Sequence, residues 1–166
     1  EEIAHYLRRR YQVSYDPLHE IMITVGGSEA IDIALRAMVN PGDEVLIPQP
    51  SYVSYEPCAV LAGAKPVIIP LKAENEFRLT AQELLDAITE KTKILILPYP
   101  NNPTGATITK EQLQGWVDYA NRVGAVILFD AAYEAYISEE DVPHSIYECE
   151  GARTCAISTA DRKSVV

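Results

Sequence analysis

The stretch that decides the fold is residues 125–136, AVILFDAAYEAY. Its apolar first half is typical of a strand buried on both faces of a parallel sheet. The run ends at Asp130, and Tyr133 follows three residues later. Ligands of open α/β sheets bind outside the carboxyl ends of the strands, so Asp130 is placed to meet a cationic ligand atom. The alternative is that Asp130 only caps the following turn, as Asp often does.

The composition is that of one folded domain. The 166 residues are 48% hydrophobic, with 14 Lys and Arg against 24 Asp and Glu and a net charge of −10. A chain of this size can bury a real core. The negative charge argues against nucleic-acid and anionic-membrane partners, which need clustered basic residues. No apolar run approaches the length of a membrane span.

Cysteines and histidines are scattered along the chain. The three cysteines form no C-x-x-C pair, so we expect neither a disulfide framework nor a metal site. Unpaired cysteines are typical of a reducing compartment, and we therefore expect a cytoplasmic protein.

Strand and helix patterns alternate along the chain. Besides the strand that ends at Asp130, strands are expected at residues 21–25, 44–47, 66–71, 93–97 and 154–157. Helices are expected at residues 2–11, 28–39, 54–62, 80–89 and 109–124. This alternation predicts an α/β fold, with a largely parallel sheet, helices on both faces and right-handed crossovers.

Three helix starts carry capping signals. Ser28 is a candidate N-cap for the helix after Gly26 and Gly27. Residues 80–83 and 109–112 each read Thr-x-x-Glu or Thr-x-x-Gln, which predicts a capping box.

Four unusual segments follow predicted strands and therefore share one rim of the sheet. They are residues 26–29 (GGSE), 51–52 (SY), 101–105 (NNPTG), and Asp130 with Tyr133. A Gly-Gly-Ser turn that opens a helix can hold an anion on free backbone amides, although it is also common as a plain turn. Tyr52 can stack on a flat ring or simply pack. NNPTG either presents Asn102 at the rim or forms an elaborate turn.

Taken together, these residues resemble the fold-type I pyridoxal-phosphate enzymes, specifically the class I/II aminotransferases. Within that family the chain is similar to the aromatic, aspartate and LL-diaminopimelate aminotransferases. The segments that carry the resemblance are residues 23–55, 96–106 and 126–137, within a match that covers about residues 1–157. The resemblance implies the large, cofactor-binding domain of such an enzyme, incomplete here.

The resemblance also implies a role for each rim residue. Gly27, Ser28 and Glu29 would supply amides and a hydroxyl to the phosphate of pyridoxal 5′-phosphate. Tyr52 would stack on the pyridine ring, while Asn102 and Tyr133 would hydrogen-bond its 3′-oxygen. Asp130 would pair with the protonated ring nitrogen, which the cofactor needs in order to accept electrons.

The chain departs from the family after residue 157. The family's covalent lysine lies in a Ser-x-x-Lys segment just after the strand predicted at residues 154–157, where this chain continues as STADRKSVV. We interpret Lys163 as part of a polar tail, residues 158–166, rather than as that lysine. We also expect the small domain, the N-terminal arm, the substrate-carboxylate Arg and a further phosphate-binding Arg to be absent. The strand at residues 21–25 would then lack its neighbour and favour self-association.

The resulting hypothesis is a fragment of an aminotransferase that is inactive alone. The parent would move an amino group between an amino acid and a 2-oxo acid as a homodimer. A β-lyase or a cyclopropane-carboxylate synthase of the same fold remains an alternative. From another class, a non-catalytic α/β module that binds a partner protein remains open. A nicotinamide-binding Rossmann domain is disfavoured, because no G-x-G-x-x-G follows the first strand.

Overall fold

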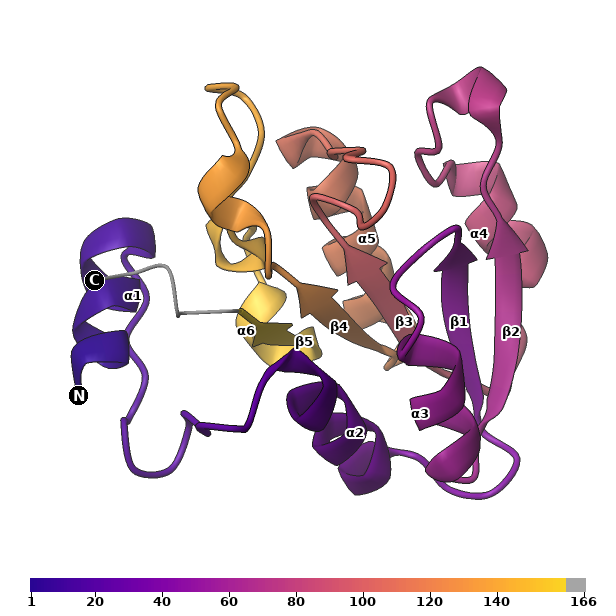
Figure 1. The fold of residues 1–166 in the computed structure, drawn as a ribbon, viewed down its shortest axis with the longest axis horizontal. Coiled ribbons are helices and arrows are strands. Elements are labelled where there is room, and N and C mark those ends of the chain that lie inside the picture. The colour runs from indigo at the N-terminus through magenta and orange to yellow at the C-terminus, as the bar shows by residue number, and fades with distance from the viewer. Residues whose placement is uncertain (161–166) are drawn as a thin grey trace.

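The computed structural model describes residues 1–160 (Figure 1). Its five strands run parallel in one sheet, in the order β2-β1-β3-β4-β5. They are β1 (Glu44–Gln49), β2 (Lys65–Pro70), β3 (Thr92–Pro98), β4 (Val126–Asp130) and β5 (Ala156–Thr159). The predicted α/β fold with a parallel sheet is confirmed.

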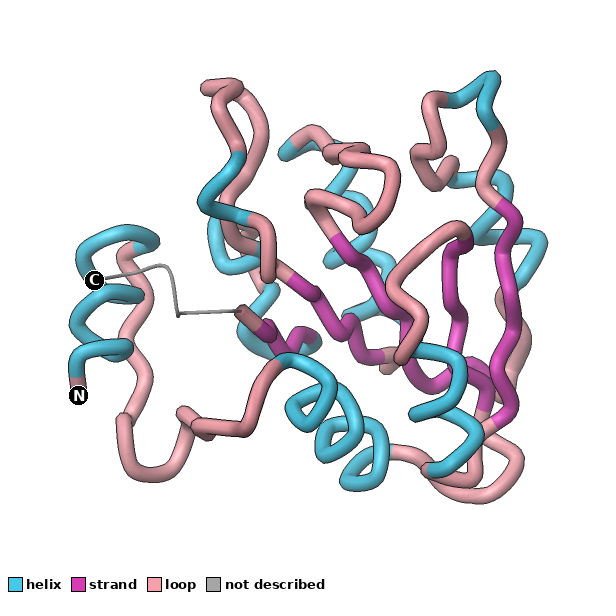
Figure 2. Tube along the Cα trace, viewed as in Figure 1, coloured by secondary structure: helices cyan, strands magenta, loops and turns pink. Residues whose placement is uncertain are grey.

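Helices and short 3₁₀ turns connect these strands (Figure 2). The α-helices are α1 (Glu2–Tyr11), α2 (Gly27–Met38), α3 (Tyr55–Leu61), α4 (Ala81–Ala87), α5 (Lys110–Val123) and α6 (Ala152–Cys155). The 3₁₀ turns are η1 (Ala73–Asn75), η2 (Glu134–Tyr136) and η3 (Ile146–Glu148). Within residues 1–160, no helix has the length and apolarity needed to cross a membrane.

The central strands β1, β3 and β4 are buried on both faces of the sheet, as their apolar sequences require. Alternate strand residues point to opposite sides. On one side Leu46, Leu97 and Phe129 join a core that α4, α5 and α6 cover. On the other side Ile47, Ile96 and Leu128 join a core that α2 and α3 cover. Helices therefore lie on both faces, in agreement with the sequence pattern.

The carboxyl ends of the three strands β3, β4 and β5 are level. Pro98 of β3 pairs in register with Asp130 of β4, and Asp130 pairs with Thr159 of β5. The loops that leave these ends therefore meet at one rim of the sheet. This is the rim at which the sequence placed its candidate site.

The strand predicted at residues 21–25 is not formed. No described strand pairs with these residues, and an isolated strand cannot satisfy its backbone groups. Met22, Ile23 and Val25 are exposed. A groove of about 450 Å³ separates this segment from β5, whose outer edge has no partner among residues 1–160.

Two other local predictions need correction. The helix after the two glycines begins at Gly27 with Gly26 as its N-cap, so Ser28 lies in its first turn and does not cap it. Gly26 adopts a positive φ of 84°, which glycine accommodates readily, and the helix begins one residue earlier than the Ser28 signal suggested. The last strand is β5, because Thr154 and Cys155 belong to the short helix α6.

Both predicted capping boxes are confirmed. Glu83 N donates to Thr80 Oγ1 at 3.3 Å, and Thr80 N donates to Glu83 Oε2 at 3.0 Å. In the same way Thr109 Oγ1 and Gln112 Oε1 each accept the other residue's backbone amide at 3.2 Å. These reciprocal bonds fix the starts of α4 and α5.

We expect Thr109→Ala to lower the free energy of unfolding by about 1 kcal/mol, because the N3 amide of α5 loses its acceptor. Urea denaturation, monitored by the fluorescence of Trp116, measures this loss, because the Trp116 side chain belongs to the core that α5 covers. Thr109→Ser keeps the hydroxyl and should stay close to the wild type. An equal loss in the serine variant would contradict the capping explanation, since it would assign the effect to the methyl group.

Candidate functional site

A cavity of about 290 Å³ lies at the carboxyl ends of the strands. It is lined by residues from all four predicted rim segments, including Gly27, Ser28, Tyr52, Asn102, Asp130 and Tyr133. The loops after β1, β3 and β4 and the first turn of α2 supply them. The structure therefore brings six of the seven sequence-predicted site residues together around one space.

Asp130 is held from two sides at the end of β4. Tyr55 donates its hydroxyl to Asp130 Oδ2 at 2.7 Å. The backbone amide of Ala132 donates to Asp130 Oδ1 at 3.1 Å. The second bond is the turn cap that the sequence offered as an alternative, so Asp130 caps its turn and lines the cavity at once.

Tyr55 is a site residue that the sequence analysis missed. Its side chain is fully buried in the first turn of α3 and lines the same cavity. Burial raises the pKa of Tyr55 above its usual value, and the neighbouring Asp130 carboxylate raises it further. Its contact with Asp130 crosses 75 positions of sequence, and no local pattern marks it.

The phosphate end predicted for the site contains a cluster of hydroxyls. Ser28 Oγ lies 2.9 Å from Tyr52 Oη and 3.3 Å from Ser54 Oγ. The Ser28 hydroxyl, followed by that of Ser54, lowers the pKa of Tyr52 below its usual value. Tyr52 also packs edge-on against Tyr55, with ring centroids 5.7 Å apart and planes at 82°. Tyr52 therefore both packs and faces the cavity.

In the NNPTG segment, one asparagine builds the turn and the other faces the cavity. Asn101 is buried and builds the turn, because its Nδ2 donates to Pro50 O and to Thr104 Oγ1, each at 2.9 Å. Asn102 points to the cavity side and donates from Nδ2 to the Tyr133 hydroxyl at 3.2 Å. The turn and the rim contact that the sequence left as alternatives occur together.

Glu29 is the predicted site residue that does not line the cavity. Its carboxylate instead accepts the backbone amide of Val25, closing the turn before α2. Only the backbone amide of Glu29, in the first turn of α2, is therefore left to contact a ligand.

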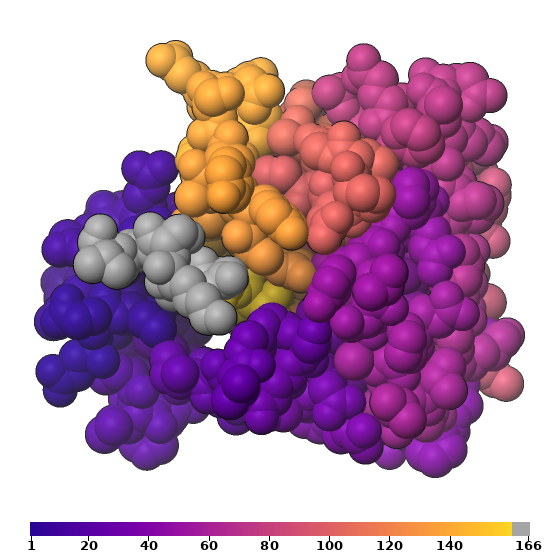
Figure 3. Space-filling model, viewed as in Figure 1, coloured from indigo at the N-terminus to yellow at the C-terminus, as the bar shows by residue number. Residues whose placement is uncertain are grey.

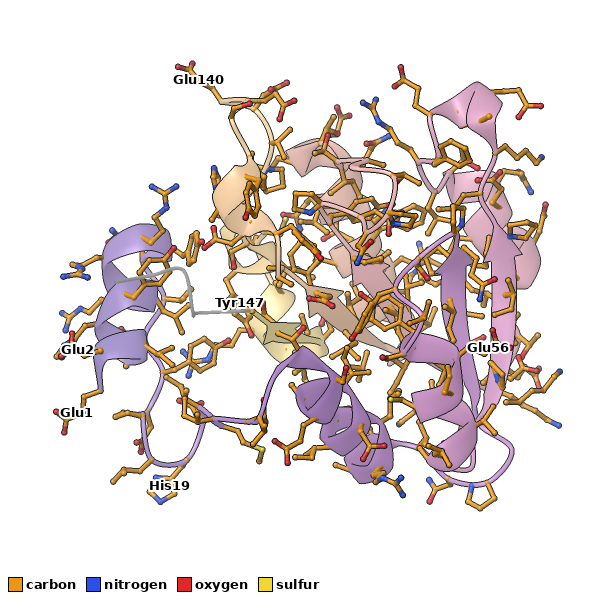
Figure 4. All side chains as sticks on the ribbon, in the orientation of Figure 1. Glu1, Glu2, His19, Glu56, Glu140 and Tyr147 are labelled. Atoms are coloured by element: carbon orange, nitrogen blue, oxygen red, sulfur yellow. The ribbon has the colours of Figure 1, made fainter. Side chains whose placement is uncertain are left out.

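The charge around the cavity is unbalanced. Asp130 is a lining residue, whereas no lysine or arginine of residues 1–160 lines the cavity. The positive end of the α2 dipole faces this region through Gly27 and Ser28. Lys163, the lysine considered from the sequence, lies outside the described residues. Asp130 is the one acidic residue of residues 1–160 that lines the cavity, and Glu140 lies at the tip of its loop (Figure 4).

Fold and site together define an α/β protein whose sheet rim can hold a flat ligand with an anionic end. The anionic end would meet the start of α2, and a ring would lie between Tyr52 and the polar groups of Asn102, Asp130 and Tyr133.

Comparison with known proteins assigns the family. Residues 1–160 match the family model for aminotransferase class I and II. The chain is 42% identical to the aspartate aminotransferase of Pyrococcus abyssi, over 91% of the chain and 39% of that relative. It is 44% identical to the LL-diaminopimelate aminotransferase of Lachnospira eligens, over 92% of the chain and 38% of that relative. The chain belongs to the class I and II aminotransferases.

The solved structures agree. An aromatic aminotransferase from Pyrococcus horikoshii superposes with a TM-score of 0.91 at 38% identity, over 96% of this chain and 43% of that one. The fold is thus the α/β fold of these pyridoxal-phosphate-dependent transferases. The chain spans well under half the length of the relatives it matches.

The Tyr55 contact predicts a pH dependence of stability. An unfolded tyrosine loses its proton near pH ~10, whereas the raised pKa keeps Tyr55 protonated in the folded state. Above pH ~10 the folded protein therefore binds more protons than the unfolded chain, and stability falls as pH rises. Because phenylalanine does not titrate, we expect Tyr55→Phe to flatten part of this alkaline decline.

Urea denaturation from pH ~8 to ~11 tests this expectation. At the lower pH the variant should be less stable by about 1.5–3 kcal/mol, since the Asp130 carboxylate loses a donor. Tyr136→Phe is the matched control, because the Tyr136 side chain is 79% exposed. The same alkaline slope in wild type and Tyr55→Phe would contradict the assignment.

Proposed function

We propose that this chain is the cofactor-binding part of a pyridoxal-phosphate-dependent aminotransferase. The parent enzyme would exchange an amino group between an amino acid and a 2-oxo acid. The observation that carries the proposal is the convergence, around one cavity, of Asp130, the start of α2 and the Asn102–Tyr133 pair. Family membership supports it from an independent direction.

The residues present fit the cofactor in kind and in arrangement. A phosphate needs backbone amides and a hydroxyl, which Gly27, Ser28 and the first turn of α2 offer. A flat aromatic ring needs an aromatic face, which Tyr52 offers. A phenolic oxygen on that ring needs polar partners, which Asn102 and Tyr133 offer.

Asp130 carries the chemistry that this chain itself contributes. Pyridoxal phosphate, when bound, supplies an electron sink that works only while its ring nitrogen keeps a proton. A carboxylate next to that nitrogen favours the protonated form through its opposite charge. Tyr55 and the Ala132 amide hold the Asp130 oxygens in place. The Asp130 carboxylate can therefore stabilise the proton on the ring nitrogen without first changing its own position.

The amino-group transfer also needs a lysine as covalent partner and base. No lysine of residues 1–160 lines the cavity, and we therefore propose that this chain alone is inactive or nearly so. We further propose that the parent is a cytoplasmic homodimer. Three buried, free cysteines support a reducing compartment.

Titration of the protein with pyridoxal phosphate tests the site. We expect weak binding. The change in the cofactor's absorbance and the quenching of tyrosine and tryptophan fluorescence measure it. Asp130→Asn keeps the side-chain shape and removes the charge, so affinity should fall roughly ten-fold or more. Asp141→Asn, in the exposed acidic loop, is the matched control. Equal affinities of the wild type and Asp130→Asn would contradict the proposed role.

Borohydride reduction of the complex tests the inactive state. Reduction traps any imine between pyridoxal phosphate and a lysine, and peptide mass mapping locates it. We expect adducts only at low yield and spread over exposed lysines. A single high-yield adduct at Lys163, together with turnover of an amino acid, would overturn the proposal of inactivity.

A further inference from the structure

Glu134 is a buried carboxylate to which the proposed chemistry gives no role. It directly follows Tyr133 and is the first residue of η2. Only 6% of its surface is exposed. Burying a carboxylate is costly unless it is hydrogen-bonded, so the partners of Glu134 indicate what it does.

Two of these partners come from the other end of the chain. Tyr6 donates its hydroxyl to Glu134 Oε1 at 2.9 Å, and Tyr11 donates to Glu134 Oε2 at 2.9 Å. Both tyrosines belong to α1 and lie edge to face, with ring centroids 5.9 Å apart and planes at 78°. One carboxylate thus receives both hydroxyls of a helix that lies 123 or more positions away.

The third partner is His144, which comes from the segment before η3. Its Nδ1 lies 3.3 Å from Glu134 Oε2. The backbone amide of His144 donates to Glu148 Oε1 at 2.9 Å, which fixes this segment in turn. Glu134 is therefore enclosed by α1 on one side and by residues 144–148 on the other.

The rest of α1 is loosely attached. Tyr11 is its one buried residue, and the groove of about 450 Å³ separates the helix from α2 and β5. Figure 3 shows the N-terminal segment, in indigo, as a lobe on the flank of the molecule. Arg153 and Tyr147 contact Ser14 and Tyr15, which follow the helix. The hydrogen bonds of Tyr6 and Tyr11 to Glu134 thus tie α1 to the turn η2.

Glu134 also sits next to the proposed site. The Tyr133 side chain is 42% exposed, its ring centroid lies 6.2 Å from that of Tyr136, and its hydroxyl accepts from Asn102 Nδ2 at 3.2 Å. Tyr133 is the N-cap residue of η2, and its carbonyl accepts the Tyr136 amide at 3.0 Å. Because Tyr133 is bonded directly to Glu134, holding Glu134 toward α1 also restricts the direction in which the Tyr133 side chain leaves the backbone.

We infer that α1 positions Tyr133 through Glu134. Tyr6 and Tyr11 hold the Glu134 carboxylate, the carboxylate fixes the turn η2, and the turn aims the Tyr133 hydroxyl at the Asn102 side of the cavity. Glu134 is a positioning residue and does not itself reach the cavity. The inference rests on the proposed function only in that Tyr133 is taken to meet the cofactor.

The first test needs no cofactor. The protein is labelled with 3-fluorotyrosine, and the ¹⁹F resonance of Tyr133 is assigned by its loss in Tyr133→Phe. We expect Tyr11→Phe and Glu134→Gln each to shift or broaden this resonance. His5→Gln changes an exposed position of the same helix and should leave it unmoved. Trp116 fluorescence shows whether each variant keeps its folded core. If Tyr11→Phe unfolds, Glu134→Gln still tests the inference, because it retains the shape of the side chain. An unmoved Tyr133 resonance in both folded variants would overturn the inference.

The second test is a double-mutant cycle on the affinity for pyridoxal phosphate. In the wild-type background we expect Tyr133→Phe to weaken binding about five-fold, the effect of one hydrogen bond. In the Tyr11→Phe background the same change should cost less than about two-fold, because Tyr133 is already misplaced. Equal losses in both backgrounds would overturn the inference while leaving the proposed site intact. If the wild type binds no cofactor, the proposed function fails and the fluorine experiment alone decides the inference.

Discussion

A carboxylate at the end of a strand buried on both faces has to keep its hydrogen bonds, and this constraint organises the rim of the sheet. Asp130 meets it with the hydroxyl of Tyr55 and the amide of Ala132. The first bond ties β4 to α3, which covers one face of the sheet. The second sets the turn that leads to Tyr133. The position of one charged group thereby fixes two of the elements around the cavity.

The parallel topology of the sheet brings the other residues of the site together. Because β1, β3 and β4 all end at the same rim, the loops after them meet without any long insertion. Tyr52 and Asn102 come from the loops after β1 and β3, Asp130 is the last residue of β4, and α2 adds its positive end from one face. The site is therefore built from the end of a rigid sheet and from the residues that directly follow its strands, which keeps its polar groups in place before a ligand arrives.

The sequence revealed local features well and distant ones poorly. Strand and helix periodicity located β1 to β4, and the Thr-x-x-Glu and Thr-x-x-Gln patterns located the starts of α4 and α5, because each of these signals is contained within a few residues. Residues 21–25 have a strand's composition, but a strand needs a neighbour to pair with, and composition cannot supply one.

Contacts between distant positions explain the other differences. No local sequence pattern singles out Tyr55 or Glu134, because the partner of each lies 75 or more positions away, in Asp130 for Tyr55 and in α1 for Glu134. The resemblance to a known family supplied roles for Asn102 and Tyr133 that no spacing argument could have given. It supplied nothing about Tyr55 or Glu134, which became visible only through their geometry.

The anchoring of α1 also has a consequence for synthesis on the ribosome. Translation proceeds from the N-terminus, yet the carboxylate that holds Tyr11 lies 123 positions further on. An isolated helix of 10 residues is too short to be stable by itself in water. During most of translation α1 therefore has nothing to dock against, and it can settle only after the fourth strand and its turn have left the exit tunnel. The helix α1 thus precedes its partner Glu134 in the sequence, yet it can dock only after Glu134 has been synthesised.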